Sequence, residues 1–371
     1  MKKIVLVLLA VLMAVAVAGV LSSCSNSDTV VLNVYNWGEY LSRGEEGTYD
    51  TNAEFEKWYF ETYGKKIRVN YDTYDSNETL RSRLESGAVN YDVIIPSDYM
   101  IEYFIANDML AELNFDNIPA YANISETYRN LYYDRENKYS IPYTYGVVGI
   151  IYDANKVDPA DVTGWEVMWN EKYKKDILQF SNSRDAFGTA MFMLDLDVNS
   201  TDRAVWDTAY NKLVEQAPLV KSWVMDEIYN DMESGEAAIG AYYAGDYFTM
   251  QEAQADGIDL QFFTPERTNV FVDAMCVPKM ARHKTEAEAY INFMLMEEAA
   301  VANALTHYYA SPNKLVVENE TYREEMGEEA LAVLYPEGYD FAEAYEKFAF
   351  RNLPTDILDY VTTLWENVRI Q

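Results

Sequence analysis

Short apolar segments alternate with helical segments over residues 30–95. The apolar segments are rich in β-branched and aromatic residues, which is typical of buried strands, and they lie at 30–35, 67–71 and 91–95. The two segments between them have helical patterns that end before Gly64 and Gly87. A strand–helix–strand–helix–strand order predicts an α/β lobe with a largely parallel sheet.

The pattern begins again after Gly146, which predicts a second lobe. At about 150 residues per domain, a chain of 371 residues has room for two. Further strands are predicted at 147–152, 237–243 and 271–277, and helices at 163–174, 184–195, 201–216, 227–234, 245–255, 285–296, 297–306 and 357–368. Ligands bind such sheets at the carboxyl ends of strands, where the loops 36–40 and 96–99 fall.

The charge of the chain favours a cationic partner. There are 61 acidic and 29 basic residues, giving a formal net charge of −32. Such a chain repels phosphate backbones, so we expect no nucleic-acid partner. The chain also has 32 Tyr. Carboxylates supply counter-charge and ring faces supply cation–π attraction, a combination that suits an organic cation.

The first residues have the pattern of an export signal. A basic start is followed by an apolar run from Ile4 to Leu21 and by Leu-Ser-Ser-Cys ending at Cys24. We expect residues 1–23 to be a lipoprotein signal peptide and 24–28 to be a lipidated Cys24 with its tether. The expected location is the cell envelope, on the outer face of the cytoplasmic membrane. An uncleaved anchor helix is the alternative, because the run is long enough to span a bilayer.

Motifs of the common enzyme and metal sites are missing from the sequence. The two histidines, His283 and His307, have no metal-ligand spacing, and no phosphate-binding glycine loop or nucleophile elbow occurs. Once Cys24 is lipidated only Cys276 remains, so no intrachain disulfide can form, and the apolar surroundings of Cys276 predict a buried strand. We expect no metal, no cofactor and no enzymatic activity.

Seven short stretches carry a family resemblance. They are YNWGEY at 35–40, YDSNET at 74–79, YDVIIPS at 91–97, SIPYTYG at 140–146, YAGD at 243–246, FVD at 271–273 and YASPN at 309–313. In this order they resemble the extracytoplasmic spermidine/putrescine-binding proteins of bacterial ABC transporters. The resemblance implies a two-lobed, periplasmic-binding-protein-like α/β fold of type II, with mostly parallel sheets, surrounding helices and a ligand cleft between the lobes. It implies one lobe at 29–146 plus 271–317 and another at 147–270 plus 318–371.

The resemblance also implies the residues of a ligand site, in which acids pair with amines and aromatic rings form walls. These residues are Trp37, Glu39, Tyr40, Ser97, Asp98, Tyr99, Asn182, Asp185, Tyr243, Asp246, Phe271, Asp273 and Tyr309. The chain departs from the family at Gly38, Asn182, Asp185 and Tyr243, where the family carries Ser or Thr, Asp, Glu and Trp. No residue is assigned to the Gln that the family carries near Phe350.

The implied function is that of a substrate-binding lipoprotein that captures putrescine or spermidine and delivers it to a permease with its ATPase subunits. We expect a monomer, held to the membrane only by the lipid on Cys24. One alternative is a receptor on the same fold for another small cation or for an amino acid. An arginine that pairs with a ligand carboxylate in the cleft would favour the amino acid. A second alternative is a secreted acid/base hydrolase, which two facing carboxylates about 5–10 Å apart would favour.

Overall fold

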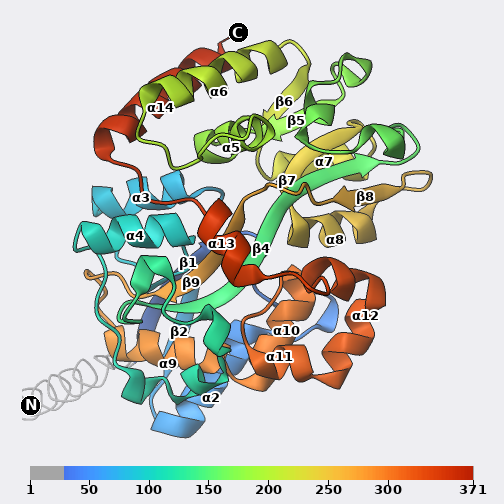
Figure 1. Ribbon diagram of the computed structural model, residues 1–371. Coiled ribbons are helices and arrows are strands. Elements are labelled where there is room, and N and C mark those ends of the chain that lie inside the picture. Colours follow the sequence, from blue (N-terminus) through green and yellow to red (C-terminus); the bar gives the residue numbers. More distant parts are fainter. Residues whose placement is uncertain (1–28, 371) are drawn as a thin grey trace, which may run out of the picture.

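The computed structural model describes residues 29–370 (Figure 1). The predicted signal peptide and the predicted lipidated Cys24 with its tether lie outside the described residues. None of the helices within 29–370 has both the length and the apolar character that a bilayer crossing requires.

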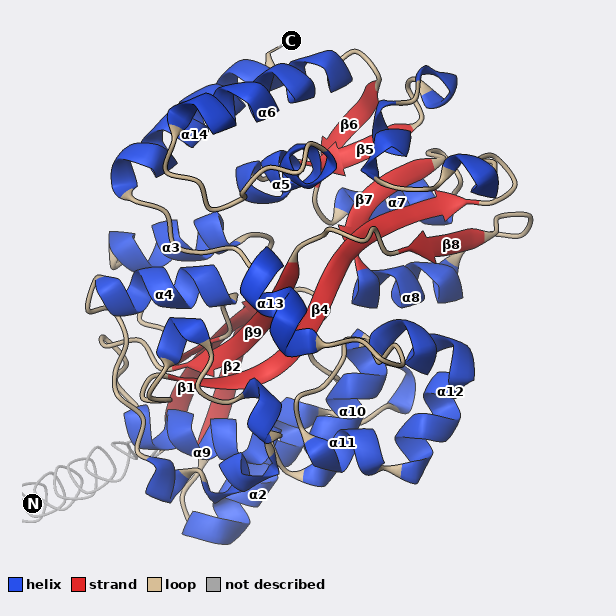
Figure 2. Cartoon of the chain, in the orientation of Figure 1, coloured by secondary structure: helices blue, strands red, loops and turns tan. Residues whose placement is uncertain are grey.

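The described strands form one curled sheet in the order β2-β1-β3-β9-β4-β7-β5-β6, with β8 beside β4 (Figure 2). They are β1 (Val30–Trp37), β2 (Ile67–Tyr74), β3 (Val93–Ile94), β4 (Ser140–Asp153), β5 (Ile177–Phe180), β6 (Val220–Val224), β7 (Ile239–Tyr243), β8 (Leu260–Phe263) and β9 (Val270–Cys276). β1 pairs in parallel with β2 and β3, and β5 pairs in parallel with β6 and β7. The pairings of β4 and β9 are antiparallel. The two ends of the sheet are therefore parallel, as predicted, whereas its centre is antiparallel.

The long strand β4 belongs to both halves of the sheet. Its first part pairs with β9 up to Val147, and its second part pairs with β7 from Val148 onward. Gly146 thus lies inside a continuous strand and not at the start of a new one. A Cβ at Gly146 would come within 2.8 Å of the Phe271 ring, so the glycine permits this ring to pack on the strand.

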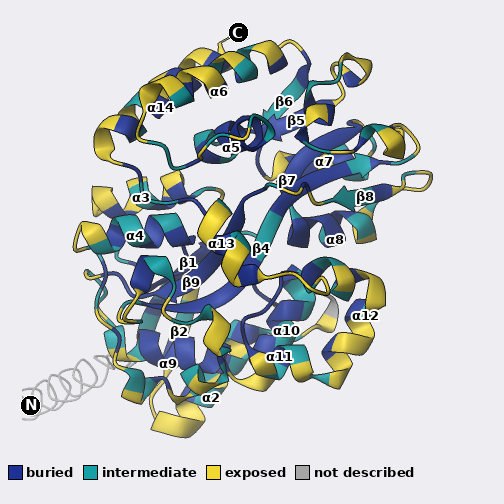
Figure 3. Ribbon diagram, in the orientation of Figure 1, coloured by how far each residue is buried: buried dark blue, intermediate teal, exposed yellow. Residues whose placement is uncertain are grey.

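The helices cover both faces of the sheet (Figures 1 and 3). They are α2 (Thr51–Tyr63), α3 (Asn77–Ser86), α4 (Asp98–Ala106), α5 (Ser183–Met193), α6 (Arg203–Gln216), α7 (Glu227–Glu233), α8 (Ala244–Ala253), α9 (Lys284–Met294), α10 (Glu297–His307), α11 (Lys314–Glu318), α12 (Glu320–Leu334), α13 (Phe341–Phe348) and α14 (Thr355–Arg369). The predicted end signals are confirmed: Gly64 and Gly87 have φ values of 67° and 62°, in the left-handed region that glycine adopts at helix ends.

One predicted helix, at 163–174, is wrong. This segment forms two short 3₁₀ turns, Trp165–Trp169 and Glu171–Tyr173. Asn170 between them has an extended backbone, and its side chain accepts a hydrogen bond from the backbone N–H of Lys172. An asparagine that caps a new turn in this way competes with continuation of the helix.

One buried core cluster extends through both halves of the sheet, and a second lies in the first half alone. In the first half, Phe55 of α2 meets Tyr290 of α9 at a ring-centroid distance of 4.9 Å. In the second half, Phe187 of α5 meets Trp206 of α6 and Trp365 of α14. α14 therefore packs in the second half, whereas α12 contacts α10 and α11 as well as α8. Cys276 is buried in β9, as predicted.

Candidate ligand-binding cleft

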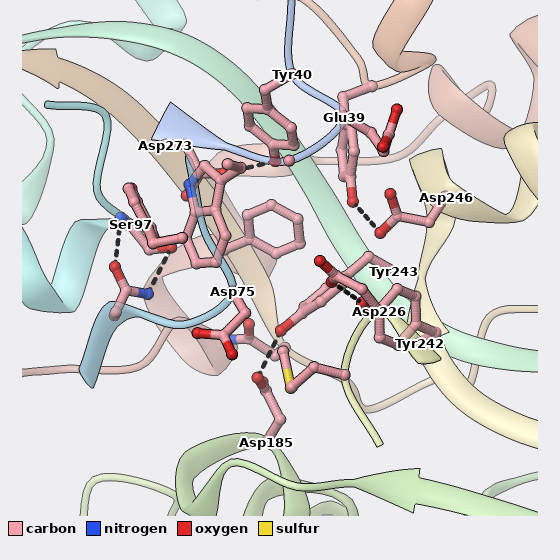
Figure 4. Close-up of a pocket in the computed structure, with 18 of the residues that line it drawn as sticks. Glu39, Tyr40, Asp75, Ser97, Asp185, Asp226, Tyr242, Tyr243, Asp246 and Asp273 are labelled. Atoms are coloured by element: carbon pink, nitrogen blue, oxygen red, sulfur yellow. Dashed lines mark hydrogen bonds between the residues drawn. The ribbon is translucent and has the colours of Figure 1, made fainter. Parts of the chain in front are cut away.

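A pocket of about 700 Å³, part of it open to solvent, lies between the two halves of the sheet. Twelve of the thirteen predicted site residues line it, including Trp37, Tyr243 and Asp273, which come from β1, β7 and β9. Residues beyond the predicted set also line it: Gly38, Tyr74, Asp75, Asn77, Met225, Asp226, Tyr229, Tyr242, Asn269 and Phe350. The labelled side chains come from both halves and surround one shared space (Figure 4).

The lining is acidic and aromatic. Its carboxylates are Glu39, Asp75, Asp98, Asp185, Asp226, Asp246 and Asp273, and no lysine, arginine or histidine is among the described residues that line the pocket. Its rings are Trp37, Tyr40, Tyr74, Tyr99, Tyr229, Tyr242, Tyr243, Phe271, Tyr309 and Phe350. Carboxylates without a basic partner attract cations, and ring faces add to that attraction.

Asp273 is the most deeply buried of the acids that have an oxygen left without a partner. The Tyr40 hydroxyl donates to its Oδ2 at 2.7 Å. Its Oδ1 is buried and makes no hydrogen bond of good geometry with the described residues. Burial raises the pKa of Asp273 to about 6, although neighbouring hydroxyls, including those of Ser97 and Tyr40, partly offset the rise. A buried, unpaired carboxylate oxygen costs free energy until a cation pairs with it.

Asp185 lies in the first turn of α5. The Tyr243 hydroxyl donates to Oδ2 of Asp185 at 2.7 Å, and Asn182 Nδ2 donates to the same oxygen at 2.8 Å. Burial raises the pKa of this carboxyl. Both donors end on Oδ2, so Oδ1 is left for a ligand.

Asn182 is the predicted site residue that does not line the pocket. It caps α5, and its Oδ1 accepts a hydrogen bond from the backbone N–H of Asp185 at 2.9 Å. Because its Nδ2 also donates to Oδ2 of Asp185, Asn182 fixes the orientation of this carboxylate. The structure therefore gives Asn182 a positioning role toward Asp185.

Asp246 is held by two tyrosines. The hydroxyl of Tyr229 donates to Oδ1 at 2.5 Å and that of Tyr309 donates to Oδ2 at 2.6 Å. Burial raises the pKa of Asp246 to about 7, which these two hydrogen bonds partly offset. Asp246 lies in the first turn of α8, which begins two residues earlier at Ala244.

Asp98 begins α4, and both of its oxygens accept hydrogen bonds. The Tyr345 hydroxyl and the backbone N–H of Val272 donate to Oδ2 at 2.9 and 3.2 Å, and the backbone N–H of Tyr99 donates to Oδ1. Burial raises the pKa of Asp98 to about 7. This carboxyl lines the pocket and joins α4, β9 and α13 through its hydrogen bonds.

The aromatic walls are held in fixed positions. The Trp37 indole donates to the carbonyl of Ile95 at 2.9 Å, and its ring packs on Tyr74 with centroids 4.6 Å apart. Ser97 exchanges two hydrogen bonds with the Asn77 side chain, which ties the start of α4 to that of α3. Walls that are already ordered lose little conformational freedom when a ligand binds.

Arg184, the residue before Asp185, does not line the pocket, although its charge lowers the pKa of Asp185 and so offsets part of the rise caused by burial. Its guanidinium stacks on the Phe350 ring at 4.5 Å and donates to the carbonyls of Val198 and Arg351. No arginine in the described residues is therefore placed to pair with the carboxylate of an amino acid in the cleft. No three His, Cys, Asp or Glu side chains of the described chain are arranged to hold a metal ion.

Two acids of the pocket that are not among the predicted site residues, Asp75 and Asp226, come within two residues after a parallel strand. Asp75 follows β2, and Asp226 stands two residues beyond β6. The loops 36–40 and 96–99 were predicted to bind ligand from this same position at a strand end. A position just after a strand is therefore the signal for both acids, but the sequence pattern of residues 220–224 does not predict a strand.

Known proteins are similar to this chain in sequence and in fold. A family profile described as bacterial extracellular solute-binding protein matches residues 89–331. The spermidine/putrescine-binding periplasmic protein of Escherichia coli is 30% identical over 308 residues, covering 81% of this chain and 83% of that protein. The putrescine-binding protein PotF of Escherichia coli is 28% identical, covering 80% and 83%. The solved spermidine/putrescine ABC transporter substrate-binding protein PotD of Streptococcus pneumoniae is 30% identical, with a TM-score of 0.71 and coverage of 92% and 99%.

The chain belongs to the family of bacterial extracellular solute-binding proteins. The predicted two-lobed α/β fold of type II is confirmed. The chain is a binding protein and not an enzyme, and it acts outside the cytoplasm.

Proposed function

We propose that this protein captures a polyamine, putrescine or spermidine, in the cleft and delivers it to an ABC importer. The single observation that carries the proposal is the lining: seven carboxylates, ten aromatic rings and no basic side chain among the described residues. A linear polyamine carries two or more ammonium groups joined by methylene chains. Each ammonium needs a carboxylate or a ring face, because burying it unpaired costs several kcal/mol.

Asp273 and Asp185 are the proposed partners of two ammonium groups. Each has one oxygen held by a tyrosine hydroxyl and another that no described residue pairs with in a good hydrogen bond. The rings of Trp37, Tyr243 and Phe271 provide flat surfaces for the methylenes, and a desolvated cation over such a ring gains about 2 kcal/mol. The names of the E. coli relatives, spermidine/putrescine-binding and putrescine-binding, support this ligand class.

The proposed lobes are 29–146 with 271–317 and 147–270 with 318–371. Within the last segment, α14 packs on α5 and α6, whereas α12 also contacts α10 and α11. Closing the lobes over a ligand removes water from the cleft and strengthens each charge–charge contact.

The proposed partners are the permease of the importer and its ATPase subunits, and the protein is proposed to act as a monomer. The lipid on Cys24 is proposed to hold it on the outer face of the cytoplasmic membrane. Detergent phase separation of membranes tests the anchor: the wild-type protein should enter the detergent phase and C24S should not. Equal partition of the two proteins would contradict the lipid anchor and would have no bearing on the proposed ligand.

Isothermal titration calorimetry tests the proposed ligand class. Putrescine, spermidine and spermine are titrated into the protein at pH 8 and constant ionic strength, with 1,4-butanediol and lysine as controls. The diol has a methylene chain without charge, and lysine adds a carboxylate that no arginine in the cleft can pair. Saturable binding of at least one polyamine and no binding of the diol is the expected result. Absence of heat and of any thermal stabilisation with all three polyamines would end the proposal.

A further inference from the structure

Asp226 lines the cleft near Tyr242 and Tyr243 (Figure 4), and it is exposed, which places it at the mouth of the cleft. The Tyr242 hydroxyl donates to Oδ1 of Asp226 at 3.2 Å. The position that a Cβ would take at Gly38 is 3.6 Å from Oδ2 of Asp226. Since Gly38 has no side chain, it leaves this oxygen open toward the cleft.

The pair of Asp226 and Tyr242 repeats the construction of the two deeper acids. The Tyr40 hydroxyl holds Oδ2 of Asp273, and the Tyr243 hydroxyl holds Oδ2 of Asp185. In all three cases a tyrosine from the pocket wall fixes one carboxylate oxygen and leaves the other available. Because Tyr242 and Tyr243 are neighbours at the end of β7, one strand end positions two of these three acids.

Two buried acids of the pocket, Asp98 and Asp246, are built differently. In Asp246 both oxygens are occupied by tyrosine hydroxyls, and in Asp98 both are occupied by hydroxyl or backbone N–H donors. Glu39, Asp75 and Asp226 are all exposed, and of these three Asp226 is the one that accepts a hydrogen bond from a tyrosine hydroxyl of the pocket. Three acids therefore combine a tyrosine that orients them with a free oxygen: Asp185, Asp226 and Asp273.

The charge around Asp226 is uncompensated. The carboxyl forms no ion pair with the described residues, and the nearby acids Asp75 and Glu39 come from the opposite half of the cleft. Partial burial raises the pKa of Asp226, and the charges of Asp75 and Glu39 raise it further. Like charges facing one another across a closing cleft favour a cation between them.

We propose that Asp226 pairs with a third ammonium group, so that the cleft selects a linear triamine over a diamine. This inference rests on the proposed polyamine-binding function. A diamine has two ammonium groups, and these take the two deeper acids, where unpaired charge costs most. A triamine also neutralises the Asp226 carboxylate, and its third ammonium group gains cation–π attraction from the Tyr242 ring beside that carboxylate.

The test compares two ligands on matched variants. Spermidine and putrescine are titrated calorimetrically at pH 8 and constant ionic strength into wild type, D226N and D256N. Asp256 is an exposed acid between α8 and β8 that does not line the cleft, so D256N controls for the loss of one negative charge. The expected result is a loss of at least tenfold in spermidine affinity for D226N, a change of less than threefold for putrescine, and no change for D256N.

Equal weakening of both ligands by D226N, or no weakening of either, would overturn the inference while leaving polyamine binding intact. Failure of the wild-type protein to bind either ligand would instead overturn the proposed function. A second variant, Y242F, keeps the carboxylate but removes the hydroxyl that orients it. We expect Y242F to lower the affinity for spermidine several-fold and to leave that for putrescine within twofold.

Discussion

The hydroxyl of Tyr309 donates to Oδ2 of Asp246 at 2.6 Å, and this bond joins the two sides of the cleft. Tyr309 follows α10, and its neighbour Ala310 bridges to Tyr145 in the first part of β4. Asp246 lies in α8, directly after β7 in the second half of the sheet. A buried hydrogen bond between a carboxyl and a hydroxyl thus forms part of the contact that the closed cleft makes.

We predict that Y309F lowers polyamine affinity by about three- to tenfold. The change leaves the ring wall in place but removes one hydrogen bond to a buried acid, a loss of roughly 1 kcal/mol. Calorimetry measures the effect. Y63F, at a tyrosine whose side chain is 49% exposed, is the matched control and should bind as wild type does. Wild-type affinity in Y309F would mean that this bond plays no part in the bound state.

Asp273→Asn should weaken polyamine binding at least tenfold, or about 1.4 kcal/mol. The amide keeps the shape of the side chain and removes the charge whose Oδ1 is buried without a good partner. Affinities of the variant and of D256N are compared by calorimetry, and circular dichroism checks that both are folded. An unchanged dissociation constant for D273N would show that the amine site lies elsewhere in the cleft.

Polyamine binding should release protons near pH 6.5. Asp246 and Asp273 have pKa values of about 7 and about 6 in the ligand-free cleft, so part of each population is protonated there. A bound cation favours the ionised carboxylate and lowers both pKa values. The affinity should therefore rise with pH up to about 7.5 and then level off. Calorimetry in two buffers of different ionisation enthalpy counts the protons, and buffer-independent heats at pH 6.5 would contradict this prediction.

The ligand-free protein should lose stability as pH rises from about 4 to 7.5 through the buried acids. Their folded pKa values lie above the unfolded value near 3.9, so the folded state binds more protons in this window and stability falls with increasing pH. For Asp246, with a pKa of about 7, the contribution is at most ~4 kcal/mol. Urea unfolding of wild type and D246N measures it. As the pH rises to 7.5, the unfolding free energy of D246N should increase relative to that of wild type. Parallel pH profiles of the two proteins would contradict the raised pKa of Asp246.

Local sequence patterns were enough to predict most of the elements. The helix limits near Gly64 and Gly87 depend on nearby residues alone, and the structure places them within a residue or two. The continuity of β4 depends instead on pairing with β9 and β7, which are distant in sequence. A glycine in the middle of a strand therefore looked like a boundary, because nothing local shows that the Phe271 ring packs over it.

Family motifs predict much of the candidate site, although Tyr74, Asp75 and Asn77 line the pocket from the motif at 74–79 without being among the predicted site residues. The loops after β1 and β3 carry such motifs, and their residues line the pocket. Asp226 and Tyr229 lie in a segment without a motif, after a strand whose alternation is weak. Asn182 is predicted as a site residue because it stands where the family carries an Asp. Its role toward Asp185 arises from the helix cap, a local geometry that sequence position alone does not distinguish from ligand contact.

Native mass spectrometry of the protein purified without unfolding is the most direct measurement of what the cleft holds. The folded protein is mixed with equimolar putrescine, spermidine, spermine, lysine and 1,4-butanediol, and its bound mass is recorded for wild type and D273N. The account predicts a one-to-one complex with a polyamine, spermidine above putrescine, that D273N sharply reduces. A folded protein that carries no polyamine from the mixture, or that carries lysine or the diol in its place, would contradict it.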